Sequence, residues 1–172
     1  MRTLALALVV ALAGCGGGPM TPLIGAARAG DTVEIARLAK AGVDLNAPGG
    51  VNNWSALEHA IHKNQVGSVG ALLEAGAEPN LVSGRTTALI MAAGYGYADI
   101  VQVLLDRGAN PRLAGPSGAT PISAAIKGSS DIDRYTAGHC QTEAAKVLLE
   151  RDPGLRADLN GGCPEVLTAL GK

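Results

Sequence analysis

Histidines and cysteines are the side chains of this 172-residue sequence with the most chemistry to offer. His59 and His62 are three residues apart and follow Glu58, so the two imidazoles would share one face of a helix. Such a pair could supply half of a metal site. A third firm ligand is not visible, because His139 is distant in sequence and Cys140 has another expected use. We favour the alternative, in which His59 is a packed polar residue and His62 is exposed. We therefore expect no metal and no other cofactor.

Composition and motifs argue against two broad function classes. The sequence contains no glycine-rich phosphate loop, serine nucleophile elbow or metalloprotease helix motif, so we expect no enzyme. The 14 Lys and Arg residues balance 15 Asp and Glu residues to a net charge of −1, and they are spread thinly along the chain. No basic cluster therefore offers a nucleic-acid footprint. Aromatic residues make up 2% of the chain, so a core must be built from Leu, Ile, Val and Ala.

The N-terminal residues 1–14 read as a secretory signal. Arg2 and the α-amino group are followed by an apolar run from Leu4 to Ala13, which is too short to span a bilayer. The run ends in Leu12-Ala13-Gly14-Cys15, which resembles a bacterial lipobox. The resemblance implies cleavage before Cys15 and acylation of that residue. An ordinary cleaved signal with an incidental cysteine is the alternative.

The lipobox carries an expectation about location. The mature chain would keep a net charge of −2, because only Arg2 is lost from the basic residues (13 − 15). More than one acyl chain on Cys15 would give stable anchoring through the short tether at residues 15–19. Gly16, rather than Asp, follows Cys15, which resembles outer-membrane lipoproteins of enteric-type bacteria. We therefore expect a lipid-anchored, periplasm-facing protein of the bacterial cell envelope, in the outer membrane.

The remainder of the chain repeats with a period near 33 residues. Four segments align, and their starts are separated by 34 (55 − 21), 32 (87 − 55) and 33 (120 − 87) residues. A second apolar stretch follows each segment, so each unit predicts a helix, a tight turn, a second helix and a loop. One unit cannot bury its apolar face, but stacked units can. The aligned segments are Thr21–Ala27, Ser55–Ile61, Thr87–Ala93 and Thr120–Ile126.

Capping residues support these boundaries. The Thr or Ser that opens each segment can cap a helix, and Pro22 and Pro121 occupy a first turn, where no amide donor is needed. Gly30, Asn64 and Gly96 stand where the first helices should end, and both residue types tolerate positive φ.

This pattern resembles the ankyrin repeat, whose motif is G-x-T-P-L-H-x-A-A-x-x-G followed by I-V-x-x-L-L-x-x-G-A. Thr87 through Asn110 fits best, and the resemblance covers about three quarters of the chain. It implies an all-α, ankyrin-type solenoid of about four repeats, with Leu72 and Leu104 in the core. The repeats would span residues 20–52, 53–84, 85–117 and 118–152. Other residues replace the motif's His in every unit, so its usual bond to Thr is lost or altered: Ile24, Glu58, Ile90 and Ser123.

The fourth unit is irregular. About eleven extra residues near 128–138 lie between its two helices, and residues 153–172 fall outside the period and would form a C-terminal capping segment. Cys140 follows the insertion and Cys163 lies in the cap, so in an oxidising compartment a disulfide would tie the two together. Two unpaired thiols are the alternative.

The resemblance also implies a binding surface for another protein. In ankyrin-like stacks the hairpin tips and first helices form a concave face with variable, outward-facing residues. Trp54 is the sole tryptophan, and with Tyr95 it belongs to residue types enriched at binding hot spots. Trp54 could instead cover the neighbouring hairpin. We expect a protein-binding module of unknown partner; the alternatives are an inhibitor or immunity protein for a periplasmic enzyme, or a metal-binding or enzymatic protein using His59 and His62. By alignment the variable positions are Arg28, Trp54, His62, Lys63, Tyr95 and Lys127.

Overall fold

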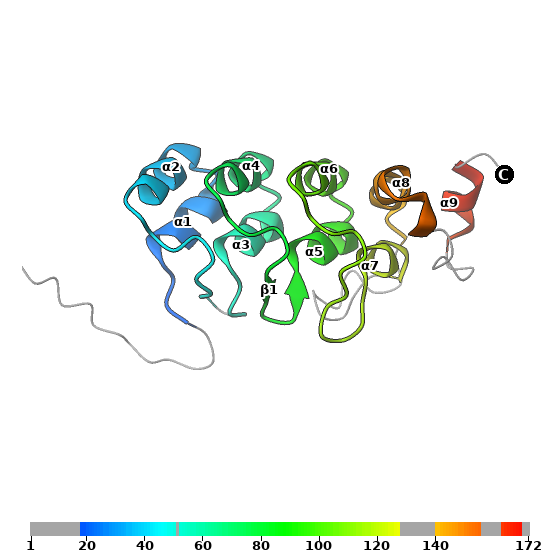
Figure 1. Ribbon diagram of the computed structural model, residues 1–172, viewed down its shortest axis with the longest axis horizontal. Coiled ribbons are helices and arrows are strands. Elements are labelled where there is room, and N and C mark those ends of the chain that lie inside the picture. The colour runs from blue at the N-terminus through cyan, green and yellow to red at the C-terminus, as the bar shows by residue number, and fades with distance from the viewer. Residues whose placement is uncertain (1–17, 51, 128–139, 156–162, 170–172) are drawn as a thin grey trace, which may run out of the picture.

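A computed structural model describes residues 18–50, 52–127, 140–155 and 163–169 of the chain (Figure 1). The predicted signal sequence at residues 1–14, Cys15 and the predicted insertion near 128–138 lie outside the described residues. Within them, no helix is both long enough and apolar enough to cross a membrane.

Apart from the last one, the helices in the described part of the chain come in antiparallel pairs that stack side by side (Figure 1). The first helix of each pair belongs to an inner row, and the second to an outer row. The fold is therefore the all-α solenoid that the repeat pattern predicts, with one pair in each predicted unit. The inner helices are α1 (Pro22–Ala29), α3 (Ala56–His62), α5 (Ala88–Tyr95) and α7 (Pro121–Lys127). The outer helices are α2 (Thr32–Lys40), α4 (Val66–Glu74), α6 (Ala98–Asp106) and α8 (Thr142–Arg151).

Local capping explains where the inner helices begin and end. The Thr21 hydroxyl accepts a hydrogen bond from the Ile24 amide at 3.2 Å, and Thr87 does the same for the start of α5. Gly30 and Gly96 end their helices with φ of 81° and 77°, and Asn64 has φ of 54° in the equivalent turn. The capping and turn predictions are confirmed at these positions.

Small and branched apolar residues fill the space between helix pairs. An alanine stands five residues after the cap of every inner helix, and each is buried. Because the alanine side chain is small, neighbouring helices can approach closely. Leu72 and Leu104 are fully buried, as predicted from the repeat register. The four alanines are Ala26, Ala60, Ala92 and Ala125.

Short hairpin loops precede the inner helices. Strands β1 (Val82–Ser83) and β2 (Thr86–Thr87) pair antiparallel and form a finger in front of α5. An earlier loop is held by isolated bridges that pair Gly18 with Gly50 and Gly49 with Trp54.

Hydrogen bonds between the loops that follow the outer helices connect successive units. Asn46 accepts a hydrogen bond from the Glu78 amide at 2.9 Å, and Asn80 accepts one from Asn110 at 2.7 Å. Between the third and fourth units, Arg112 forms a bidentate ion pair with Asp152 at 2.6 and 2.8 Å.

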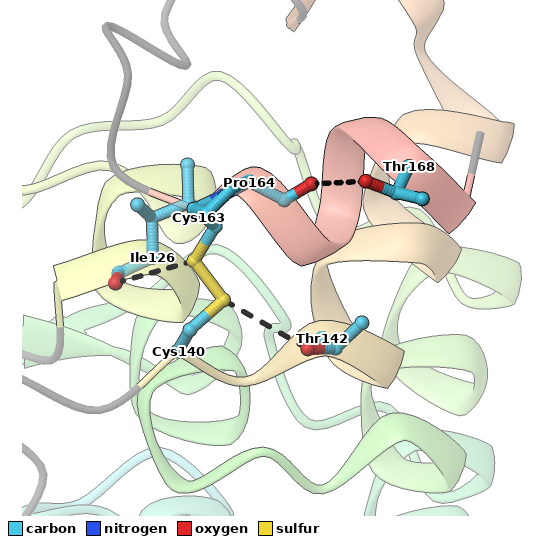
Figure 2. Close-up of a disulfide and its surroundings, with 6 residues drawn as sticks. All are labelled: Ile126, Cys140, Thr142, Cys163, Pro164 and Thr168. Carbon is cyan, nitrogen blue, oxygen red and sulfur yellow. Dashed lines mark hydrogen bonds between the residues drawn. A yellow bond between two sulfur atoms is a disulfide. The ribbon is translucent and has the colours of Figure 1, made fainter. Parts of the chain in front are cut away.

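The C-terminal end of the stack is closed by helix α9 (Pro164–Ala169), which packs against α8. A disulfide joins Cys140, just before α8, to Cys163, just before α9, with 6.2 Å between the Cα atoms (Figure 2). The Cys163 sulfur is buried and lies 3.6 Å from the carbonyl oxygen of Ile126, at the end of α7. The bridge thus links the cap to both helices of the fourth unit.

Candidate partner-binding surface

Five of the residues that alignment selects for partner binding lie at equivalent places in the stack. Arg28 is in the last turn of α1, His62 ends α3, Tyr95 ends α5 and Lys127 ends α7, while Lys63 is the residue that caps α3. Because the inner helices pack side by side in sequence order, these residues come from four consecutive units. We call Arg28, His62, Lys63, Tyr95 and Lys127 the inner edge.

Aromatic contacts connect the second and third units at the inner edge. The His62 Nδ1 and the Tyr95 hydroxyl are hydrogen-bonded at 3.0 Å, and their rings lie 5.9 Å apart. Tyr95 stacks on Tyr97 with 5.4 Å between ring centroids, and Trp54 contacts the His62 ring at the same separation of 5.4 Å. Such ring pairs add stabilisation beyond the area they bury. Two neighbouring units therefore hold Tyr95 in a fixed orientation.

Trp54 does not have the expected outward-facing position. Its side chain is only 5% exposed, and its backbone oxygen accepts a hydrogen bond from the Gly49 amide at 2.9 Å. The turn between β1 and β2 lies over the indole. A Cβ on Gly84 would come within 2.9 Å of the Trp54 ring and 2.8 Å of the Asn52 oxygen. The expectation of an exposed Trp54 is wrong, because the hairpin of the next unit covers it, and Trp54 contributes to the surface by supporting His62.

Glu58 occupies the position at which the repeat motif has its histidine. Its Oε2 accepts hydrogen bonds from the Ser55 amide at 2.9 Å, from the Ser55 hydroxyl at 3.1 Å and from the Ser83 hydroxyl. Ser83 belongs to β1, so this carboxyl group ties α3 to the hairpin of the following unit. The buried Oε1 has no hydrogen-bond partner among the described residues. Desolvation raises the pKa of Glu58 to about 8, against the opposing effect of the Ser55 hydrogen bonds.

The two histidines of the candidate metal site serve separate structures. His59 is 4% exposed, and its Nε2 donates to the carbonyl oxygen of Gly49 at 3.0 Å. Burial lowers the pKa of His59, which favours the neutral imidazole. The hydrogen bond to Gly49 holds the first hairpin loop against α3. His62 is exposed and bonds to Tyr95. In the described ranges no three His, Cys, Asp or Glu residues gather closely enough to hold a metal ion. The interpretation of His59 as a packed polar residue matches this arrangement.

Two contributors to the site were not selected from the sequence. Ser83 bonds to Glu58 from 25 residues away, and no local pattern indicates this contact. Tyr97 stacks on Tyr95 and so orients an inner-edge residue. Its position two residues after Tyr95, across the tight turn at Gly96, is the signal that could have revealed the pair.

Comparisons with known proteins support a similarity to ankyrin repeats. A family model described as "Ankyrin repeats (many copies)" matches residues 72–131. The human ASB11 ankyrin repeat domain has a similar structure, with a TM-score of 0.59 and 30% identity, over 77% of this chain and 54% of that one. Among curated proteins, the E3 ubiquitin-protein ligase hecd-1 of Caenorhabditis elegans is 29% identical over 78% of this chain. Zygote-specific protein 3 of Chlamydomonas reinhardtii is 35% identical over 55% of it.

The similarity is confined to part of each relative. The chain spans 5% of the length of hecd-1 and 26% of that of Zygote-specific protein 3. The comparison therefore gives no support for the ligase activity of hecd-1 in this chain. What the structural comparison supports is the repeat fold that the chain shares with the ASB11 ankyrin repeat domain.

Proposed function

Because the described part of the chain is an ankyrin-repeat solenoid, we propose that the protein is a membrane-anchored interaction module that binds another protein through its inner edge. The single observation that carries the binding proposal is the alignment of Arg28, His62, Lys63, Tyr95 and Lys127 along four consecutive units. Ankyrin repeats generally mediate contacts between proteins. Tyr and Arg are also types that supply a large share of the energy in protein interfaces.

The stack supplies what such a surface needs. Neighbouring units orient the inner edge through the contacts of Tyr95 with His62 and Tyr97 and through the packing of Trp54. A surface that is already ordered loses little conformational freedom when a partner binds. The Glu58–Ser83 contact further restricts the second hairpin relative to α3.

Site-specific photo-crosslinking tests the binding proposal. A photoreactive phenylalanine analogue in place of Tyr95 should give a discrete adduct with an envelope protein. The same analogue in place of Val33, which is 79% exposed on the outer helix α2, is the matched control and should give no such adduct. Equal adducts at both positions, or none at either, would contradict an interaction through the inner edge.

Anchoring and location form the second part of the proposal. The lipobox-like Leu12-Ala13-Gly14-Cys15 supports acylation of Cys15, and the Cys140–Cys163 disulfide fits an oxidising compartment such as the periplasm. Cys15→Ala should abolish incorporation of labelled palmitate and move the protein out of the detergent phase. The Cys140→Ala variant should still be labelled and serves as the control for loss of a cysteine. Unchanged labelling of Cys15→Ala would reject the lipoprotein assignment, and membrane fractionation would test the outer-membrane location.

A further inference from the structure

Charged side chains are distributed unequally between the two helix rows. On the described inner helices and their C-terminal caps, the cations are Arg28, Lys63 and Lys127. The carboxylic acid found on these helices is Glu58, which is 1% exposed and bonded to Ser55 and Ser83. The inner edge therefore presents positive charge to solvent.

The carboxylates of the described residues otherwise lie on the outer helices, on the segments that flank them or on α9. Many are already paired with nearby cations. Glu74 contacts Arg107 at 2.7 Å and Asp152 contacts Arg112 at 2.6 Å, while Glu143 contacts Lys146 at 2.7 Å. These carboxylates are Asp31, Glu34, Asp44, Glu74, Glu78, Asp99, Asp106, Glu143, Glu150, Asp152 and Glu165.

The cations of the inner edge differ in this respect. Lys63 and Lys127 are exposed and form no ion pair within the part of the chain that the structure describes, and Arg28 contacts the sulfur of Met20 at 3.9 Å. Asp31, three residues after Arg28, caps α2 by accepting a hydrogen bond from the Glu34 amide at 2.9 Å. Among the described residues, positive charge at the inner edge is thus available for a negatively charged ligand.

Spacing narrows the kind of ligand that could use these cations. Neighbouring packed helices lie about 8–10 Å apart, so Arg28 and Lys63 are separated by about one such step and Lys63 and Lys127 by about two. An extended chain advances about 3.3 Å per residue, so these steps correspond to about three and about six residues. Tyr95, half-buried between the two lysines, would contact the middle of such a chain.

From this arrangement we propose that the inner edge binds an extended acidic segment of the partner protein, with carboxylates near positions i, i+3 and i+9. The inference rests on the proposed interaction function and adds the chemical class of the partner. Charge complementarity of this kind mainly sets the association rate and specificity. A protein segment is favoured over nucleic acid, because the whole chain has a net charge of −1 and the outer row would repel a long polyanion.

A peptide-binding experiment with matched charge variants tests the proposal. The full chain, extracted in mild detergent, is titrated against a fluorescent peptide with Glu at i, i+3 and i+9 in a Ser/Gly background. The inner variant combines Arg28→Glu, Lys63→Glu and Lys127→Glu. The outer variant makes the same change in net charge through Arg37→Glu, Lys40→Glu and Lys146→Glu. Circular dichroism establishes that both fold, and Lys63→Glu alone replaces the inner variant if it does not.

The inner variant should bind the peptide roughly tenfold more weakly than wild type, whereas the outer variant should bind within about twofold. A peptide with the three Glu residues adjacent should bind more weakly than the spaced one. Equal losses in both variants, or no loss in either, would overturn the proposal. A single-stranded oligonucleotide that binds more tightly than the peptide, with loss in the inner variant, would also overturn it in favour of nucleic acid.

The crosslinked native partner separates this inference from the proposed function. Sequencing of the segment attached at the Tyr95 position should show clustered Asp and Glu, and the adduct should disappear in the inner variant. An adduct with a non-acidic segment would reject the acidic ligand and leave the interaction module intact. Absence of any adduct at Tyr95 would instead reject the interaction function itself.

Discussion

Replacing Glu58 with Gln should change how the stability of the stack depends on pH. Burial raises the pKa of this carboxyl group from 4.5 to about 8. Between these values the folded protein holds a proton on Glu58 that the unfolded chain has released. The free energy of unfolding therefore falls as pH rises through this window, by about 1.4 kcal/mol for each pH unit and by up to about 5 kcal/mol in total.

The Glu58→Gln substitution would remove this titration while keeping the shape of the side chain. The carbonyl oxygen of the new amide can accept the hydrogen bond that Ser55 now donates at 2.9 Å. The variant should resemble wild type near pH 5 and become progressively more stable than wild type up to about pH 8. Above that pH the difference should level off, because the carboxyl group of wild type is then ionised in both the folded and the unfolded state.

Urea unfolding followed by circular dichroism between pH 5 and pH 9 measures the effect. His59, whose pKa is lowered by burial, makes the opposite contribution, since its stabilisation is lost as pH falls below about 6.5. That contribution is present in both proteins and cancels when one profile is subtracted from the other. Glu150→Gln, an exposed change on α8, should keep the wild-type slope. A constant difference between wild type and Glu58→Gln from pH 5 to pH 9 would refute the reasoning.

Three further substitutions test the packing and the cap. Leu104→Ala should lower the free energy of unfolding by about 2–5 kcal/mol, because Leu104 is fully buried between pairs, and a loss under about 1 kcal/mol in urea titration would contradict this packing. Trp54→Ala should cost about 3–5 kcal/mol while crosslinking per folded molecule at Tyr95 continues, whereas an unchanged melting temperature would show that the indole is not part of the scaffold. Cys140→Ser should cost about 3 kcal/mol through the loss of the link to Cys163, and mass spectrometry of unreduced wild type should show the linked peptides rather than two free thiols.

Local sequence signals were sufficient to predict the helix pairs. Thr21, Thr87, Gly30 and Gly96 act within a single turn of chain, so their roles can be read from neighbouring residues alone. Leu104 could be placed in the core because the repeat period puts it at the same position as Leu72. Features that recur once per unit and depend on nearby residues were therefore predictable.

Features that depend on contacts between units were not predictable in the same way. The burial of Trp54 is produced by Gly84, which lies 30 residues later and approaches the indole because it has no side chain. The capping role of Glu58 follows from its spacing to Ser55, but its bond to Ser83 depends on the geometry of the next hairpin. The inner edge was predicted residue by residue through alignment, while the aromatic contacts that orient it required the three-dimensional arrangement.

The covalent bridge at one end of the stack has a mechanical consequence. Each unit is held by its neighbours, and the first pair, α1 and α2, has a neighbouring pair on one side within the described chain. At the opposite end, the Cys140–Cys163 disulfide is covalent, so tension cannot extend the chain between these two residues unless the S–S bond is broken. A force pulling on the two ends of the chain should therefore peel the solenoid from α1 and α2 inward. The residues from Cys140 to Cys163 would extend last, and only after reduction.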